Sequence, residues 1–196
     1  DIVEISKNAV LTEGTAGDLK VNEKIKFNDL LNLLLVASSN DAATALAEKI
    51  GEDNFVNLMN EKVLIIGAEN THFCNVHGLS DCNSQYSTSQ DLADISYFIF
   101  QNYPEIIDII SRKEVRFISL SGYEHFELNT NKLLGEENIL GGKTGFTKEA
   151  GDCILLFLKP PENLKDILVI LLLGTDDRTL RAREFIDWLK IAYLWK

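Results

Sequence analysis

A lysine, a threonine and a glycine stand side by side at Lys143-Thr144-Gly145, within the run from Gly141 to Thr147. The chain turns apolar shortly afterwards, over Cys153 to Leu158, so we expect this run at the edge of a β-strand. Glycines carry no Cβ, and they let the backbone of a ligand come close to the lysine and the hydroxyl. A match of three residues means little alone, so this motif needs a partner elsewhere in the chain.

A hydroxyl and an amide lie far upstream, in Ser38-Ser39-Asn40. They follow the apolar run Leu30 to Ala37 and precede the alanine-rich stretch that starts at Asp41, so we expect them between two helices. A hydroxyl-amide pair between helices, followed along the chain by a K-T-G strand, is the motif order of penicillin-recognising serine enzymes.

Further segments extend this resemblance, in the same order, over nearly all 196 residues. They are Val10 to Ile25, Asn70-Thr71-His72-Phe73, Val76-His77-Gly78-Leu79, Tyr86-Ser87-Thr88, Asp91-Leu92-Ala93 and the C-terminal helix from Arg178. The sequence resembles the D-alanyl-D-alanine carboxypeptidases, the low-molecular-mass penicillin-binding proteins of peptidase family S11. The resemblance implies an α+β fold of the serine β-lactamase and D,D-transpeptidase type, with an antiparallel sheet, flanking helices and a helical lobe.

The same resemblance implies a serine-type carboxypeptidase that needs no cofactor and no metal. Its substrate would be the D-alanine-ending stem peptide of peptidoglycan, and β-lactam antibiotics would bind the full-length protein. A β-lactamase on the same fold is an alternative. The H-G-L segment and Tyr86-Ser87-Thr88 favour the carboxypeptidase, and the sequence shows no deacylating-glutamate motif of the class A type.

Three catalytic roles follow from the resemblance. Ser38 would carry protons toward the leaving nitrogen, and Asn40 would hydrogen-bond the backbone carbonyl of the substrate. Lys143 would add positive charge and hold the Ser38 hydroxyl.

The resemblance also implies four substrate-binding residues. Thr144, with Lys143, would bind the terminal carboxylate, and Arg178 would help to bind it. The strand edge at Gly145 and Phe146 would pair with the substrate backbone, with the Phe146 amide as one oxyanion donor.

The sequence departs from the family pattern at the nucleophile. The family carries an S-x-x-K motif before the hydroxyl-amide motif, and no Ser or Thr in this chain has a Lys three positions later. Either an N-terminal part of the domain lies outside this sequence, or the chain is a homologue without a nucleophile. The second reading predicts a non-catalytic protein that binds cell-wall peptides or a partner protein. On both readings we expect this chain alone to be inactive.

Each of these residues also has a purely structural interpretation. Ser38 and Asn40 could cap the helix that begins near Asp41. Lys143 could be an edge-strand charge that blocks aggregation, and Arg178 could form a helix-start ion pair with the neighbouring aspartates. His77 is interpreted as a structural loop histidine and not as a general base.

Composition limits the partners of the protein. A net charge of −11 argues against nucleic-acid binding, which needs a basic face. The start of the chain lacks the basic and apolar regions of a secretion signal, and the longest apolar runs are too short to cross a bilayer. Since peptidoglycan is the implied substrate, we expect an extracytoplasmic protein whose export signal or membrane anchor lies outside this sequence.

Three cysteines leave more than one interpretation open. Cys74 and Cys82 lie in one loop and could form a disulfide in an exported protein, whereas Cys153 is expected to be a small buried residue. His72 and His77 lie in the same loop, but their spacing with the cysteines does not match the usual zinc patterns.

Hydrophobic periodicity predicts the elements that position these residues. We expect helices over residues 27–37, 41–50, 53–66, 89–103, 104–111 and 180–195, and strands over 3–11, 114–120, 123–128, 143–147, 152–158 and 166–174, with a turn at 160–163. They would form a single partial domain, 1–196, with a helical lobe at 27–111 and a sheet-containing part at 1–26 and 112–196. Without a nucleophile helix, a groove between lobe and sheet would need filling, so a homodimer is one hypothesis.

Overall fold

The computed structural model describes residues 1–14, 16–80, 82, 84–160 and 167–192. Seven helices and seven strands are described within these ranges. The helices are α1 (Lys7–Leu11), α2 (Phe27–Ala37), α3 (Asn40–Ala47), α4 (Glu52–Ile66), α5 (Ser89–Asn102), α6 (Pro104–Ile110) and α7 (Arg178–Ala192). The strands are β1 (Ile2–Glu4), β2 (Lys24–Lys26), β3 (Glu114–Ile118), β4 (Glu124–Leu128), β5 (Ile139–Thr147), β6 (Gly151–Leu158) and β7 (Leu168–Thr175).

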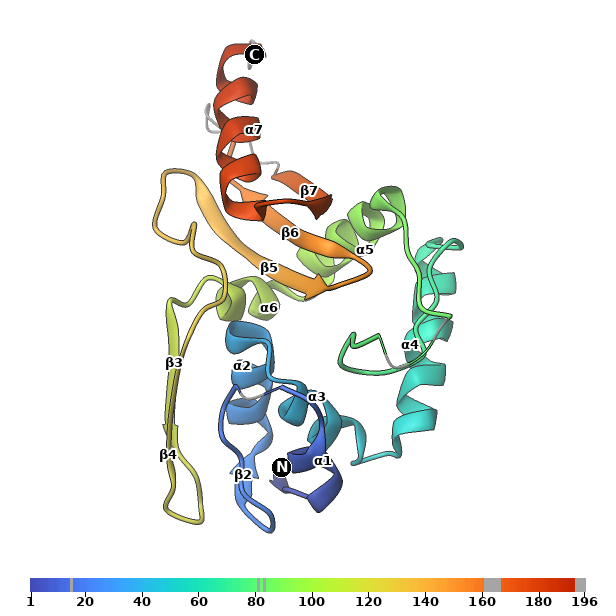
Figure 1. Cartoon of the computed structure of the whole chain (residues 1–196), viewed down its shortest axis with the longest axis vertical. Helices are drawn as coiled ribbons and strands as arrows, with labels where there is room; N and C mark the ends of the chain where they lie inside the picture. Colours follow the sequence, from blue (N-terminus) through green and yellow to red (C-terminus); the bar gives the residue numbers. More distant parts are fainter. Residues whose placement is uncertain (15, 81, 83, 161–166, 193–196) are drawn as a thin grey trace.

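All described strand pairs are antiparallel, and they form three separate sheets. β1 pairs with β2, β3 forms a hairpin with β4, and the largest sheet has the order β5-β6-β7. In Figure 1 this largest sheet and α7 occupy the upper part of the molecule, and α1, α2 and α3 the lower part. The K-T-G motif lies on β5, which has only one neighbouring strand among the described residues.

Two hydrophobic cores hold the elements together. The first joins β1, β2 and the β3–β4 hairpin to α2 and α3, with Leu30, Leu33 and Val36 fully buried at its centre. The second packs α7 on the large sheet through buried residues such as Leu156, Ile170 and Ala182. The division of the chain at residues 27 and 111 stays a prediction.

One expected strand is wrong. Residues 3–11 form the short strand β1 followed by the helix α1, because Ser6 caps a helix there. Its hydroxyl accepts a hydrogen bond from the Ala9 amide at 2.9 Å. The strand β2 lies where no element was expected, and the remaining described elements match their expected ranges to within a few residues at each end. Parts of the turn at 160–163, the strand start at Asp166 and the helix end beyond Ala192 lie outside the described residues.

Candidate active site

The junction of α2 and α3 shapes the first half of the site. Ser38 ends α2 in the left-handed region, with φ 61°, and Ser39 begins α3 as its N-cap. The Ser39 hydroxyl accepts the Ala42 amide at 3.2 Å. Capping therefore belongs to Ser39, and the structural interpretation of Ser38 and Asn40 as caps is wrong.

Lys143 reaches across to this junction from β5. Its Nζ donates to Ser38 Oγ at 2.5 Å and to the Thr144 carbonyl at 3.2 Å. The two motifs, 105 residues apart in the chain, thus meet directly. The contact also excludes an edge-strand charge pointing into solvent, which was the structural interpretation of Lys143.

The environment of Lys143 changes its acidity. Burial and, to a smaller extent, the positive charge of Arg178 together lower the pKa of Lys143 from 10.5 to about 8. No carboxylate pairs with Lys143 among the described residues. The amine therefore loses its proton more readily than an ordinary lysine, which suits a group that exchanges protons with Ser38.

Asn40 is held by the segment that precedes β2. Its Nδ2 donates to the Glu13 carbonyl at 2.7 Å. Gly14 lies so close that a Cβ there would stand 2.8 Å from Asn40 Nδ2, and its φ is +122°. Only a glycine fits this approach without moving the amide.

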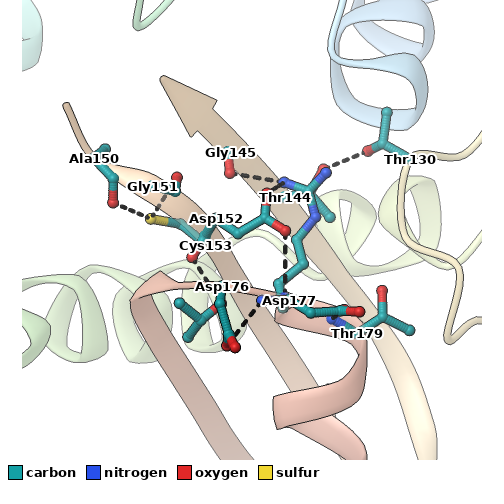
Figure 2. A network of polar contacts seen from close by, with 12 residues as sticks. Thr130, Thr144, Gly145, Ala150, Gly151, Asp152, Cys153, Asp176, Asp177 and Thr179 are labelled. Carbon is teal, nitrogen blue, oxygen red and sulfur yellow. Dashed lines mark hydrogen bonds and ion pairs between the residues drawn. The ribbon is translucent and has the colours of Figure 1, made fainter. Parts of the chain in front are cut away.

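Thr144 is almost completely buried, and its hydroxyl is engaged. Thr144 Oγ1 donates to Thr130 Oγ1 at 2.7 Å, as the dashed line between them shows in Figure 2. Thr130 lies between the strands expected at 123–128 and 143–147, and no functional role was predicted for it. The sequence holds no signal for this contact, because it depends on how the loop after β4 packs against β5.

Arg178, the first residue of α7, lies beside the same strand. One of its guanidinium nitrogens donates to the Gly145 carbonyl at 2.8 Å and lies 3.4 Å from Asp152 Oδ1. Asp152 Oδ2 also accepts the Arg178 amide at 3.3 Å. The structural interpretation of Arg178, an ion pair with Asp176 and Asp177, is wrong, since Arg178 pairs with Asp152 and Asp176 pairs with Arg181.

A cleft of about 490 Å³ collects these residues. Ser38 and Asn40 line one side, and the β5 residues Lys143 to Phe146 line another. The third side comes from the loop between α4 and α5, including His77 and Leu79. The cleft therefore brings together all the expected site residues except Arg178, which contacts the Gly145 carbonyl but does not line the cleft.

His77 fits its expected structural role in one respect. Its Nδ1 accepts the Leu79 amide at 3.3 Å, and this bond shapes the loop that forms the cleft wall. The same wall is tied to the turn after β5, where Ser80 Oγ donates to Glu149 Oε2 at 2.5 Å.

Cys74 and Cys82 are joined by a disulfide within this wall. Cys153, expected to be buried, is only partly covered, and its sulfur accepts the Gly174 amide at 3.5 Å. Within the described ranges, no group of three or more His, Cys, Asp or Glu side chains is arranged to hold a metal ion.

Asp41 is a second unusual ionisable group next to the site. The residue is 4% exposed, and its Oδ1 has no hydrogen-bond partner among the described residues. Burial raises the pKa of Asp41 from 3.8 to about 6. Burying the charged form of this carboxylate without a partner lowers the stability of the folded protein.

Within the described part of the chain, no helix is both long and apolar enough to cross a membrane.

Comparison with known proteins identifies the family. Residues 1–171 match the family model of the D-alanyl-D-alanine carboxypeptidases, Peptidase_S11. The chain is 34% identical to DacA of Haemophilus influenzae over 175 residues, covering 87% of this chain and 43% of that protein. It is 31% identical to DacD of Escherichia coli K12 over 96% of this chain and 50% of that protein. The chain thus spans about half the length of the curated relatives it matches.

Solved structures show the same fold. A penicillin-binding protein homolog from Mycobacterium tuberculosis, Rv2911, superposes with a TM-score of 0.87 at 28% identity, covering 100% of this chain and 76% of that one. The D-alanyl-D-alanine carboxypeptidase DacD from Francisella tularensis gives 0.86 at 26% identity, with 98% and 58% covered. The expected fold is confirmed by this agreement, and the chain belongs to the D-alanyl-D-alanine carboxypeptidase family, peptidase family S11.

Proposed function

We propose that this chain is the substrate-binding and proton-transfer part of a serine-type D-Ala-D-Ala carboxypeptidase that acts on peptidoglycan stem peptides. The observation that carries the proposal is the 2.5 Å contact between Lys143 Nζ and Ser38 Oγ in a cleft that also holds Asn40 and Thr144. The names of its relatives support the same activity.

Ser38 and Lys143 form the proton-transfer pair of the proposed mechanism. Hydrolysis through an acyl-enzyme needs a proton donor for the leaving amine. Ser38 donates its hydroxyl proton to that amine, and Lys143 supplies a proton to Ser38 in turn. Because the pKa of Lys143 is lowered to about 8, the lysine can give up and regain this proton near neutral pH.

The substrate lies along the edge of β5. Its terminal carboxylate meets Thr144 and the charge of Lys143, and Arg178 contributes positive charge from outside the cleft lining. The substrate backbone pairs with the strand at Gly145 and Phe146. The Phe146 amide donates to the oxyanion. Asn40 binds the backbone carbonyl of the substrate from the opposite side of the cleft.

The nucleophile is not among these 196 residues, because no Ser or Thr precedes a Lys by three positions. That observation also favours the second candidate function, a non-catalytic homologue that binds cell-wall peptides or a partner protein. In the catalytic case an S-x-x-K segment elsewhere in the complete protein supplies the nucleophile. We further propose that the complete protein is extracytoplasmic, carries its export signal or anchor outside this chain, and binds β-lactams.

Two measurements on the complete gene product test the proposal. Incubation with a peptide that ends in D-Ala-D-Ala should release D-alanine, and intact-mass analysis with penicillin should show one covalent adduct. The 196-residue chain alone should show neither. Binding of the peptide without D-alanine release or an adduct would establish the non-catalytic alternative.

A homodimer is a separate proposal for the isolated chain. It rests on the expectation that the groove between the helical lobe and the sheet does not stay open in a stable monomer. Light scattering combined with thermal melting tests it. A monomer with a high, cooperative melting transition would refute it.

A further inference from the structure

A short loop connects the two halves of the cleft from behind. The residues Asn129-Thr130-Asn131 follow β4, and the Thr130 amide donates to the Val36 carbonyl at 3.3 Å. Val36 lies in the last turn of α2, two residues before Ser38. On its other side, the same loop touches the K-T-G strand through the Thr130 hydroxyl.

Hydrogen bonds on both sides of Thr130 fix this loop. Asn129 Nδ2 donates to the Arg112 carbonyl at 2.8 Å, and Asn129 Oδ1 accepts the Asn131 amide at 2.8 Å. Asn131 Oδ1 accepts the Leu133 amide at 3.0 Å, and the Leu133 side chain is fully buried. The Thr130 hydroxyl is therefore presented to β5 from a rigid support.

The two hydroxyls of Thr130 and Thr144 can exchange roles without moving a heavy atom. A hydroxyl has one proton to donate and two lone pairs that accept. In the structure Thr144 donates its proton to Thr130 over 2.7 Å. A carboxylate is an acceptor only, so binding one turns the Thr144 proton away from Thr130. The Thr130 hydroxyl can then rotate and donate to the oxygen of Thr144.

We propose that Thr130 is a positioning residue for recognition of the terminal carboxylate. Its hydroxyl keeps the buried Thr144 oxygen hydrogen-bonded both in the free site and in the occupied one. In the occupied site, the chain from Thr130 through Thr144 to the carboxylate strengthens each bond by polarisation. This inference rests on the proposed function, since it assigns a supporting residue to the same carboxylate site.

Isosteric substitution in the complete gene product tests the proposal. Thr130→Val removes the hydroxyl and keeps the shape, and Thr130→Ser keeps the hydroxyl. Thr12→Val is the matched control, because Thr12 and Thr44 form the same kind of hydroxyl pair, at 2.9 Å, between α1 and α3. Each variant is assayed on a peptide ending in D-Ala-D-Ala with a free carboxylate and on the same peptide as its C-terminal amide.

We expect Thr130→Val to lower kcat/KM for the free acid by roughly three- to tenfold, mainly through KM, the effect of one net hydrogen bond. Thr130→Val should hydrolyse the amide as fast as the wild type does. Thr130→Ser should restore kcat/KM for the acid, and Thr12→Val should leave kcat/KM unchanged for both substrates.

Three results would overturn the inference while leaving the proposed function in place. They are an unchanged KM for the acid in Thr130→Val, an equal loss for acid and amide, or failure of Thr130→Ser to rescue. If the wild-type protein binds neither peptide, and releases neither D-alanine from the acid nor D-alaninamide from the amide, the proposed function itself is refuted. The role of Thr130 is then refuted with it.

Discussion

Lys143 and His125 are both basic side chains held inside the molecule, but their partners differ. His125 Nε2 lies 2.7 Å from Glu23 Oε1, and its Nδ1 lies 2.6 Å from the Gly17 carbonyl. The ring stacks on Phe117 at 4.7 Å between centroids, and both His125 and Glu23 are buried. Every polar atom of this imidazole has an acceptor in place, and the pair lies outside the cleft.

Lys143 has a poorer set of partners. Its Nζ contacts a hydroxyl and a carbonyl, and no carboxylate among the described residues balances its charge. Its pKa falls to about 8 as a result of burial and the nearby Arg178. The comparison teaches that a fully paired buried base serves the fold, whereas an incompletely paired one is available for chemistry.

The comparison predicts that removing Lys143 costs activity and not stability. In the complete gene product, Lys143→Ala should lower kcat/KM for D-Ala-D-Ala peptides by about 10²- to 10⁴-fold, the usual range for an acid–base group. The melting temperature should stay the same or rise. Steady-state kinetics and thermal melting measure both, with the exposed Lys24→Ala as control. A large loss of stability with little loss of activity would contradict the assignment of Lys143 to catalysis and His125 to the fold.

His125 should show the opposite pattern. His125→Leu leaves Glu23 buried without its partner, which costs about 3–5 kcal/mol in the free energy of unfolding. Denaturant unfolding measures this loss. Activity per folded molecule should change little, because the pair does not touch the cleft. The double variant Glu23→Gln/His125→Leu should recover part of the stability, and its failure to do so would argue against a charge effect.

Asp41 tests whether an incompletely paired carboxylate lowers stability. Its pKa is about 6 in the folded protein and 3.8 in the unfolded chain, so the folded state holds the proton more tightly. The stability that comes from the protonated form is complete below pH 4 and is lost as the pH rises through 6. Asp41→Asn should therefore stabilise the protein by about 1–3 kcal/mol at pH 7. Unfolding curves at pH 4 and pH 7 measure the difference, and an equal effect at both pH values would contradict it.

The smallest expected effect concerns the coupling of Arg178 to Lys143. Because Arg178 lowers the pKa of Lys143, Arg178→Gln should move the limb of the kcat profile near pH 8 to higher pH. The displacement should be smaller than the whole shift, since burial is its larger cause. A profile measured at saturating substrate separates this effect from weaker carboxylate binding. No displacement would mean that the limb belongs to another group.

The sequence predicted the elements that depend on local pattern. The helix over residues 27–37 and the β3–β4 hairpin appear where expected, because apolar spacing and turn residues act over a few positions. The prediction of a strand over residues 3–11 was wrong, because the alternation of apolar and polar residues is weak there and Ser6 caps a helix. The order of the motifs along the chain predicted Ser38 and Lys143 as site residues. The structure places Ser38 Oγ and Lys143 Nζ 2.5 Å apart, and their catalytic roles stay predictions.

Only the tertiary structure decided what supports these residues. Three contacts join separate segments of the chain. They are the hydrogen bond between Thr144 and Thr130, the ion pair of Arg178 with Asp152, and the hydrogen bond from Asn40 to the Glu13 carbonyl. Such contacts arise when strands and loops pack, and no periodicity in the sequence encodes them. The same packing buries Asp41 and lowers the pKa of Lys143, since both effects require solvent to be excluded by elements that meet only in the folded protein.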